Sequence, residues 1–148
     1  MEAFAALIVL FLGVVICYAV YAFLLRLFWW LGFGRSGMRG LFFYSDNPNY
    51  VGFVEGTIVP LLPMRVVVTN LSSLSSRRAQ SLLLSRIHAH WTGEKDHTPV
   101  AIVFLSFWKV RSVKLYRPTL KAVRGNTITL ERQLQSMHAL IGETGHAP

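Results

Sequence analysis

The chain of 148 residues has one cysteine and only seven acidic residues, and charged residues make up 15% of the total. The lone cysteine, Cys17, excludes an intramolecular disulfide, so the fold is not that of a small oxidised scaffold. The acidic residues are dispersed, and no two of them have a spacing that suggests a paired general acid and base. The sequence also lacks the H-E-x-x-H and G-x-S-x-G motifs. We therefore expect a protein that is not an enzyme.

Metal ligands are also scarce. The histidines considered as ligands are His88, His90, His97 and His138. On a helix, two residues at i and i+2 lie about 200° apart, so His88 and His90 would not face the same ion. No Cys/His spacing typical of a zinc site accompanies them. We expect no metal, no cofactor and no small-molecule substrate.

The chain does have one long apolar run. From Ala3 to Leu25 there are 23 consecutive residues without a charge, enough to cross a bilayer core of roughly 30 Å at about 1.5 Å per residue. A cleaved signal peptide would have a positive amino-terminal region and a shorter apolar stretch, whereas here Glu2 precedes the run. A buried core helix is disfavoured too, because roughly 120 residues are too few to surround it. We expect an uncleaved transmembrane anchor over residues 1–31.

The stretch that follows, LLRLFWWLGFGRSGMRG, predicts where the membrane ends. Tryptophan rings belong at the interface, and arginine can extend its long side chain toward the head groups. The residues predicted at the membrane interface are Arg26, Trp29, Trp30, Arg35 and Arg39. All 15 basic residues lie at or after Arg26, and flanking positive charge is typical of the cytoplasmic or matrix side. We therefore expect the N-terminus outside and the C-terminal domain inside.

Two further patterns lie in or beside this anchor. Ala6, Gly13 and Cys17 recur at +7 and +4, which places small residues on one helical face and predicts packing against another helix. The segment Gly32–Gly37 matches G-x-G-x-x-G, with Glu55 18 residues beyond it. A dinucleotide site needs a strand before the glycines and a helix after them, and here a membrane span precedes them. We interpret residues 32–50 as a glycine-rich linker that leaves the bilayer.

The remainder, residues 51–148, predicts a small basic α+β domain, so the fold class is α+β with one N-terminal transmembrane helix followed by a small mixed α/β domain. Leu41–Tyr44 would lie either in the domain or on the membrane surface. The strands expected from β-branched or apolar content are Thr57–Val59, Arg65–Thr69 and Val100–Trp108. The helices expected from apolar spacing are one from Ser75 or Ser76 to Trp91, and one that carries Leu130, Leu134, Met137 and Ile141 and ends at Gly142. A hairpin is expected to turn at Gly125-Asn126.

A dense group of basic residues is the strongest functional signal. The residues predicted to bind an anionic partner are Lys109, Arg111, Lys114, Arg117, Lys121 and Arg124. No acidic residue interrupts them, so the local field is strongly positive. An anionic lipid leaflet or an acidic protein would fit, whereas the absence of an RNA-binding signature disfavours nucleic acid. A solvated surface without a partner is the alternative.

These features together predict a non-catalytic accessory or assembly subunit of a larger membrane protein complex. Its partners would be other membrane-protein subunits and anionic phospholipid. Energy-transducing membranes contain many such subunits, so we expect a mitochondrial or bacterial inner membrane and a role beside the respiratory chain. The alternative is a stand-alone membrane-tethered module that recruits anionic lipid, nucleic acid or an acidic protein through the basic residues.

Overall fold

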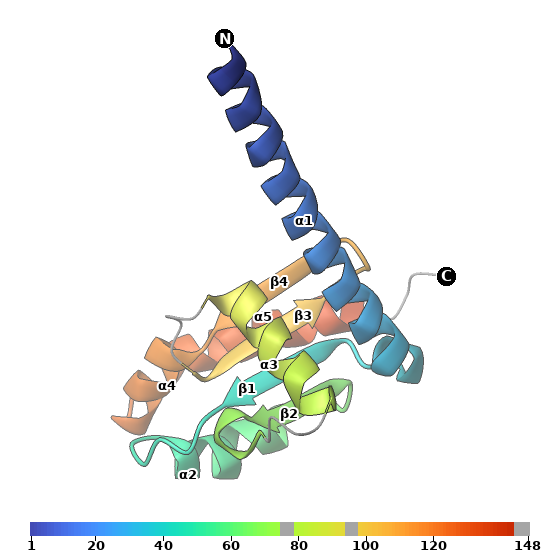
Figure 1. Ribbon diagram of the computed structural model, residues 1–148. Helices are drawn as coiled ribbons and strands as arrows, with labels where there is room; N and C mark the ends of the chain where they lie inside the picture. The colour runs from blue at the N-terminus through green and yellow to red at the C-terminus, as the bar shows by residue number, and fades with distance from the viewer. Residues whose placement is uncertain (75–78, 94–97, 144–148) are drawn as a thin grey trace.

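The computed structural model describes residues 1–74, 79–93 and 98–143. A long N-terminal helix leads into a small domain with a four-stranded mixed sheet, so the fold is α+β as predicted (Figure 1). The helices and strands, in chain order, are α1 (Glu2–Gly32), η1 (Gly34–Ser36), β1 (Gly40–Tyr44), α2 (Val51–Phe53), η2 (Val54–Ile58), η3 (Val59–Leu61), β2 (Val66–Asn70), η4 (Leu71–Ser73), α3 (Ala79–Thr92), β3 (Val100–Phe104), β4 (Val110–Lys114), α4 (Tyr116–Val123) and α5 (Ile128–Glu143).

The sheet has the strand order β2-β1-β3-β4. β1 pairs in parallel with β2 and antiparallel with β3, and β3 pairs antiparallel with β4. The central strands β1 and β3 are buried along their whole length. A strand covered on both faces needs apolar side chains at every position, which explains the unbroken apolar sequences of these two strands. Leu41–Tyr44 thus lies in the core and not on the membrane surface.

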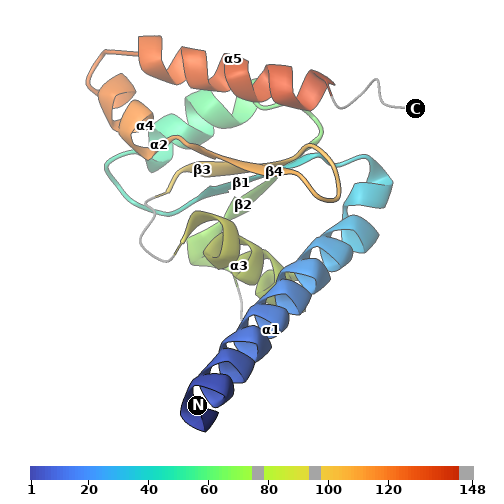
Figure 2. The same cartoon turned by 90° about the horizontal axis from the view of Figure 1, so that it is seen from above.

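Helices cover both faces of the sheet (Figure 2). On one face, Phe42 and Val103 pack against the buried side of α5, together with α2, η2 and α4. On the other face, Phe43 and Ile102 pack against α3 and the last turns of α1. Successive residues of a strand point to opposite faces, so each central strand contributes to both cores.

α1 is the one helix, among the described residues, that is long and apolar enough to span a membrane. Its residues up to Tyr21 are exposed on all sides. From Ala22 onward one side of the helix is buried on the domain. The helix therefore has an uncovered N-terminal part and a C-terminal part that belongs to the protein core.

Several predicted elements are confirmed. β2, α3, β3 and α5 lie where strands and helices were expected. The predicted apolar stripe of α5 is buried throughout, at Leu130, Leu134, Met137 and Ile141. The helix continues through Gly142 to Glu143, so it does not end at that glycine. The expected start of α3 at Ser75 or Ser76 lies outside the described residues.

Two predicted elements are wrong. Residues 57–59 were expected as a strand, but they lie in the helical segments η2 and η3, where Val54 and Ile58 place two buried side chains one turn apart. The hairpin expected at Gly125 is a turn between α4 and α5. The turn itself was located correctly, since Gly125 has φ +94°, which favours glycine.

Candidate functional site

The junction between α1 and the domain is built around Trp29. Its indole is fully buried and stacks on Phe33 at 4.8 Å and on Phe104 at 4.5 Å between ring centroids. Leu25, one turn earlier, is buried in the same cluster. The prediction that Trp29 presents its ring to the membrane interface is therefore wrong. The face of the sheet that carries Phe104 needs an apolar cover, and the end of α1 provides it.

The other residues predicted at the interface are less deeply placed. Trp30 and Arg39 are half-buried and contact each other, with the guanidinium 5.2 Å from the ring centroid. Arg26 is half-buried as well, and its guanidinium lies 5.9 Å from the ring of Trp91. Arg35 is exposed in η1. Each of the two half-buried arginines thus pairs with an aromatic face, an arrangement favourable for a guanidinium.

A second group of aromatic residues surrounds α1 closer to its N-terminus. On one side, His90 at the end of α3 lies 5.3 Å from Tyr18 and 5.7 Å from Tyr21 between ring centroids. On the other side, Phe23 lies near the turn between β3 and β4. We define the aromatic collar as Tyr18, Tyr21, Phe23, His90, Phe107 and Trp108. The collar marks the level at which the domain first meets the helix.

The β3–β4 turn contributes the most exposed part of the collar. Phe107 and Trp108 lie 5.5 Å and 6.2 Å from Phe23 between ring centroids, yet Trp108 remains 70% exposed. The backbone of the turn is closed by a hydrogen bond from Leu105 N to Lys109 O of 2.9 Å. This contact was not predicted from the sequence, because the strand was expected to extend to residue 108, whereas β3 ends at Phe104.

The histidines do not converge on a metal site. Among the described residues no three His, Cys, Asp or Glu side chains lie close enough to hold an ion. His88 packs on Phe43, and Nε2 of His138 is 2.8 Å from the carbonyl oxygen of Leu61. Burial lowers the pKa of His90, and the nearby positive charge of Arg26 lowers that pKa further. His97 lies outside the described residues.

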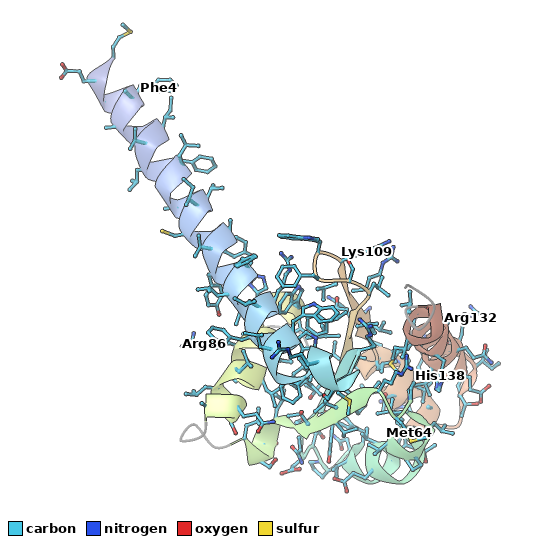
Figure 3. All side chains as sticks on the ribbon, turned by 90° about the vertical axis from the view of Figure 1, so that its right-hand side faces the viewer. Phe4, Met64, Arg86, Lys109, Arg132 and His138 are labelled. Carbon is cyan, nitrogen blue, oxygen red and sulfur yellow. The ribbon has the colours of Figure 1, made fainter. Side chains whose placement is uncertain are left out.

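We refer to the six basic residues predicted to bind an anionic partner together as the basic band. They lie in the β3–β4 turn, on the edge strand β4, along α4 and, for Arg124, at the C-cap of α4, and every one is exposed. On α4 the basic residues oppose a buried side formed by Pro118, Thr119 and Ala122. Basic residues on an edge strand also hinder pairing with a foreign strand. Lys109 lies on the side of the domain from which α1 extends (Figure 3).

The glycine-rich segment does not form a dinucleotide site. The glycines follow the helix α1 and lead through η1 into β1, which is the reverse of the strand-then-helix order that phosphate binding needs. The segment 32–50, expected as a linker, contains the central strand β1. Within it, Gly37 turns the chain with φ +80°.

The small residues predicted to pack against another helix lie in the uncovered part of α1. Ala6, Gly13 and Cys17 are all exposed. A Cβ built on Gly13 would meet no atom within 4 Å. The backbone at this position is therefore open to close approach by another helix.

Two further features lie at opposite ends of the domain. An apolar groove of about 720 Å³ separates the end of α1 from the start of α3, between Phe28 and Leu83. At the end of β1, the hydroxyls of Ser45, Tyr50 and Thr98 bond to one another at 2.8 to 3.0 Å. These hydroxyls satisfy one another, so we assign them to the stability of the strand end.

The arrangement as a whole offers surfaces for association. The features available to partners are the uncovered apolar part of α1, the aromatic collar and the basic band. Comparison with protein-family models, with curated proteins and with solved structures finds no match for this chain.

Proposed function

We propose that this protein is a non-catalytic accessory or assembly subunit of a larger membrane protein complex. In this proposal α1 is a single span, and the domain lies on the matrix or cytoplasmic side of a mitochondrial or bacterial inner membrane. The observation that carries the proposal is the division of α1 into two parts. Its first part exposes apolar side chains in every direction, and its last turns are built into the core of the domain. Such an uncovered surface is stable in lipid or against other apolar helices.

The surface of α1 also supports partners of the same chemistry. Gly13 opens a gap among bulky neighbours, which suits close helix packing. The apolar groove beside Phe28 suits a side chain of a neighbouring subunit. Both features favour protein partners in addition to lipid.

The experiment that tests this proposal is the native mass of the full-length protein, extracted from its own membrane in mild detergent. Migration in a discrete assembly of hundreds of kilodaltons is expected, and the co-migrating proteins would identify the complex. A Gly13→Leu variant should no longer migrate with the assembly, because the added side chain blocks close approach of another helix. Val14→Leu, next to it on the same helix, is the matched control. Migration of the unaltered protein as a monomer would refute the proposal.

A stand-alone, membrane-tethered binding module is the second candidate, and the exposed basic band favours it. The part of the band on α4 and at its C-cap, namely Arg117, Lys121 and Arg124, is exposed and therefore accessible. Reversing these three charges to glutamate should abolish recruitment of an acidic protein to membranes that contain the full-length chain. Arg132→Glu is the control, because it reverses one exposed charge on α5, outside the basic band. Retained recruitment after the triple reversal would exclude this function for α4.

A further inference from the structure

The aromatic residues in the C-terminal half of α1 fall at two levels, and only one of these levels can coincide with the membrane surface. The 12 residues from Tyr18 to Trp29 span a rise of about 16 Å along the helix. The end of α3 and the β3–β4 turn both contact α1 at the upper level, that of Tyr18 to Phe23. The lower level, at Trp29, is inside the domain.

If the head groups lay at the lower level, part of the domain would lie inside the hydrocarbon core of the bilayer. The β3–β4 turn, with the charged Lys109, would then lie roughly 9 Å inside the hydrocarbon, which is the rise from Phe23 to Trp29. Irregular backbone and an ammonium group are both strongly unfavourable there. The upper level has no such conflict. The 19 residues from Ala3 to Tyr21 rise about 28 Å, which matches a hydrocarbon core of roughly 30 Å.

We propose that the aromatic collar lies at the lipid headgroup level, and that Phe107, Trp108 and Lys109 of the β3–β4 turn form a second membrane contact beside α1. This inference rests on the proposed span of α1 and adds a lipid-binding surface to it. The partner is the surface of an anionic glycerophospholipid bilayer.

The chemistry of the turn fits the headgroup region. Trp108 exposes most of its indole, and tryptophan is favoured at the interface because its ring is apolar while its N–H can donate a hydrogen bond. Lys109 follows directly, and its ammonium group can reach the lipid phosphates, which attract positive charge. The backbone hydrogen bond from Leu105 N to Lys109 O satisfies two polar groups of the turn internally, so the turn enters the interface at low cost.

The orientation of the sheet extends the same surface. β4, with the exposed Arg111 and Lys114, is the sheet edge closest to the N-terminal part of α1, and β2 is the edge farthest from it (Figure 1). The strand that continues from the β3–β4 turn thus places two more positive charges along this edge, Arg111 on the face covered by α5 and Lys114 on the face covered by α3. Positive charge at this edge complements anionic head groups.

Site-directed spin labelling of the full-length chain in vesicles of phosphatidylcholine and phosphatidylglycerol tests the inference. In a Cys17→Ala background, single cysteines replace Val9, Phe28, Met64 or Trp108. Collision with oxygen and with an aqueous nickel complex then reports the depth of each nitroxide. Val9 and Phe28 are exposed positions of α1. Met64 is 97% exposed and lies on the side of the domain away from the N-terminus of α1 (Figure 3).

The expected result is a deep label at 9, a label at 108 within about 5 Å of the phosphates, and aqueous labels at 28 and 64. A label at 108 as aqueous as the one at 64, with 9 deep, would overturn the second contact while leaving the span in place. A label at 28 at the phosphates with 108 deep in hydrocarbon would overturn the collar as the boundary. An aqueous label at 9 would refute the span itself and the inference with it.

A readout without a label at position 108 supplements this test. Brominated lipids quench tryptophans that lie close to the bilayer. In the otherwise unaltered chain, the Trp108→Phe substitution should reduce the fluorescence that brominated lipids quench. The difference between the two proteins is the contribution of the Trp108 ring. Equal quenching in both proteins would contradict the proposal.

Discussion

Replacing Trp29 by alanine tests whether the end of α1 belongs to the domain. Trp29 is fully buried and stacks on two rings. Removing a buried aromatic side chain of this kind costs about 3–5 kcal/mol, a large share of the roughly 5–15 kcal/mol that stabilises a small domain. A tryptophan facing lipid at the membrane surface would contribute little to the stability of the domain.

Hydrogen exchange of the central strands is the assay, because the amides of β1 and β3 open only when the core opens. A loss of about 3 kcal/mol should speed their exchange by roughly 100-fold or more in the full-length protein in mild detergent. Phe28→Ala is the matched control, since Phe28 lies one residue away on the same helix and is exposed. Its effect should stay below about threefold. Equal exchange rates in the two variants would refute the packing described for α1.

Two further predictions concern the same junction. Burial and the positive charge of Arg26 hold the pKa of His90 below its ordinary value of 6.5. As the pH falls, His90 therefore binds a proton in the unfolded chain before it does so in the folded one. The free energy of unfolding should be at its full value above about pH 6.5 and fall at lower pH. The thermal midpoint should therefore fall less between pH 7.5 and pH 5.5 in His90→Phe than in the unaltered protein, and an equal fall would exclude the effect. Gly34→Ala places a Cβ 2.5 Å from Cε3 of Trp30, so the thermal midpoint should drop by the equivalent of about 1–3 kcal/mol. Gly32→Ala meets no atom within 4 Å and should cause no drop, so a matching drop in this control would contradict the explanation by steric overlap.

The elements that the sequence predicted correctly are those whose periodicity is strong. α5 buries one residue per turn over its whole length, and β3 is a short run of apolar residues between breaks in the pattern. Both signals come from the contact of the element with a core, so they survive without knowledge of the neighbours. Residues 57–59 were misassigned because β-branched content is only a local preference, and tertiary packing of Ile58 overrides it.

The contacts of the candidate site could not be predicted from periodicity. An aromatic residue at the end of an apolar run can face lipid or protein with equal local preference, so Trp29 could not be placed from its neighbours in sequence. The pairing of Phe23 with the β3–β4 turn joins residues more than 80 positions apart, and no pattern within either segment predicts it. The basic residues were recognisable as a group by their density. Their alignment along β4 and α4 depends on the order of strands in the sheet.

The packing of α1 also determines how motion in the membrane would reach the domain. A flexible linker would allow the domain to rotate freely about the helix axis. Here Leu25 and Trp29 are part of the core, and α3 and the β3–β4 turn contact α1 on two sides. Rotation or tilt of the helix must therefore move the sheet as one body, since closely packed interiors transmit displacement. In the proposed assembly, a partner that grips the uncovered part of α1 would thereby determine which residues of the basic band face the bilayer and which face other subunits.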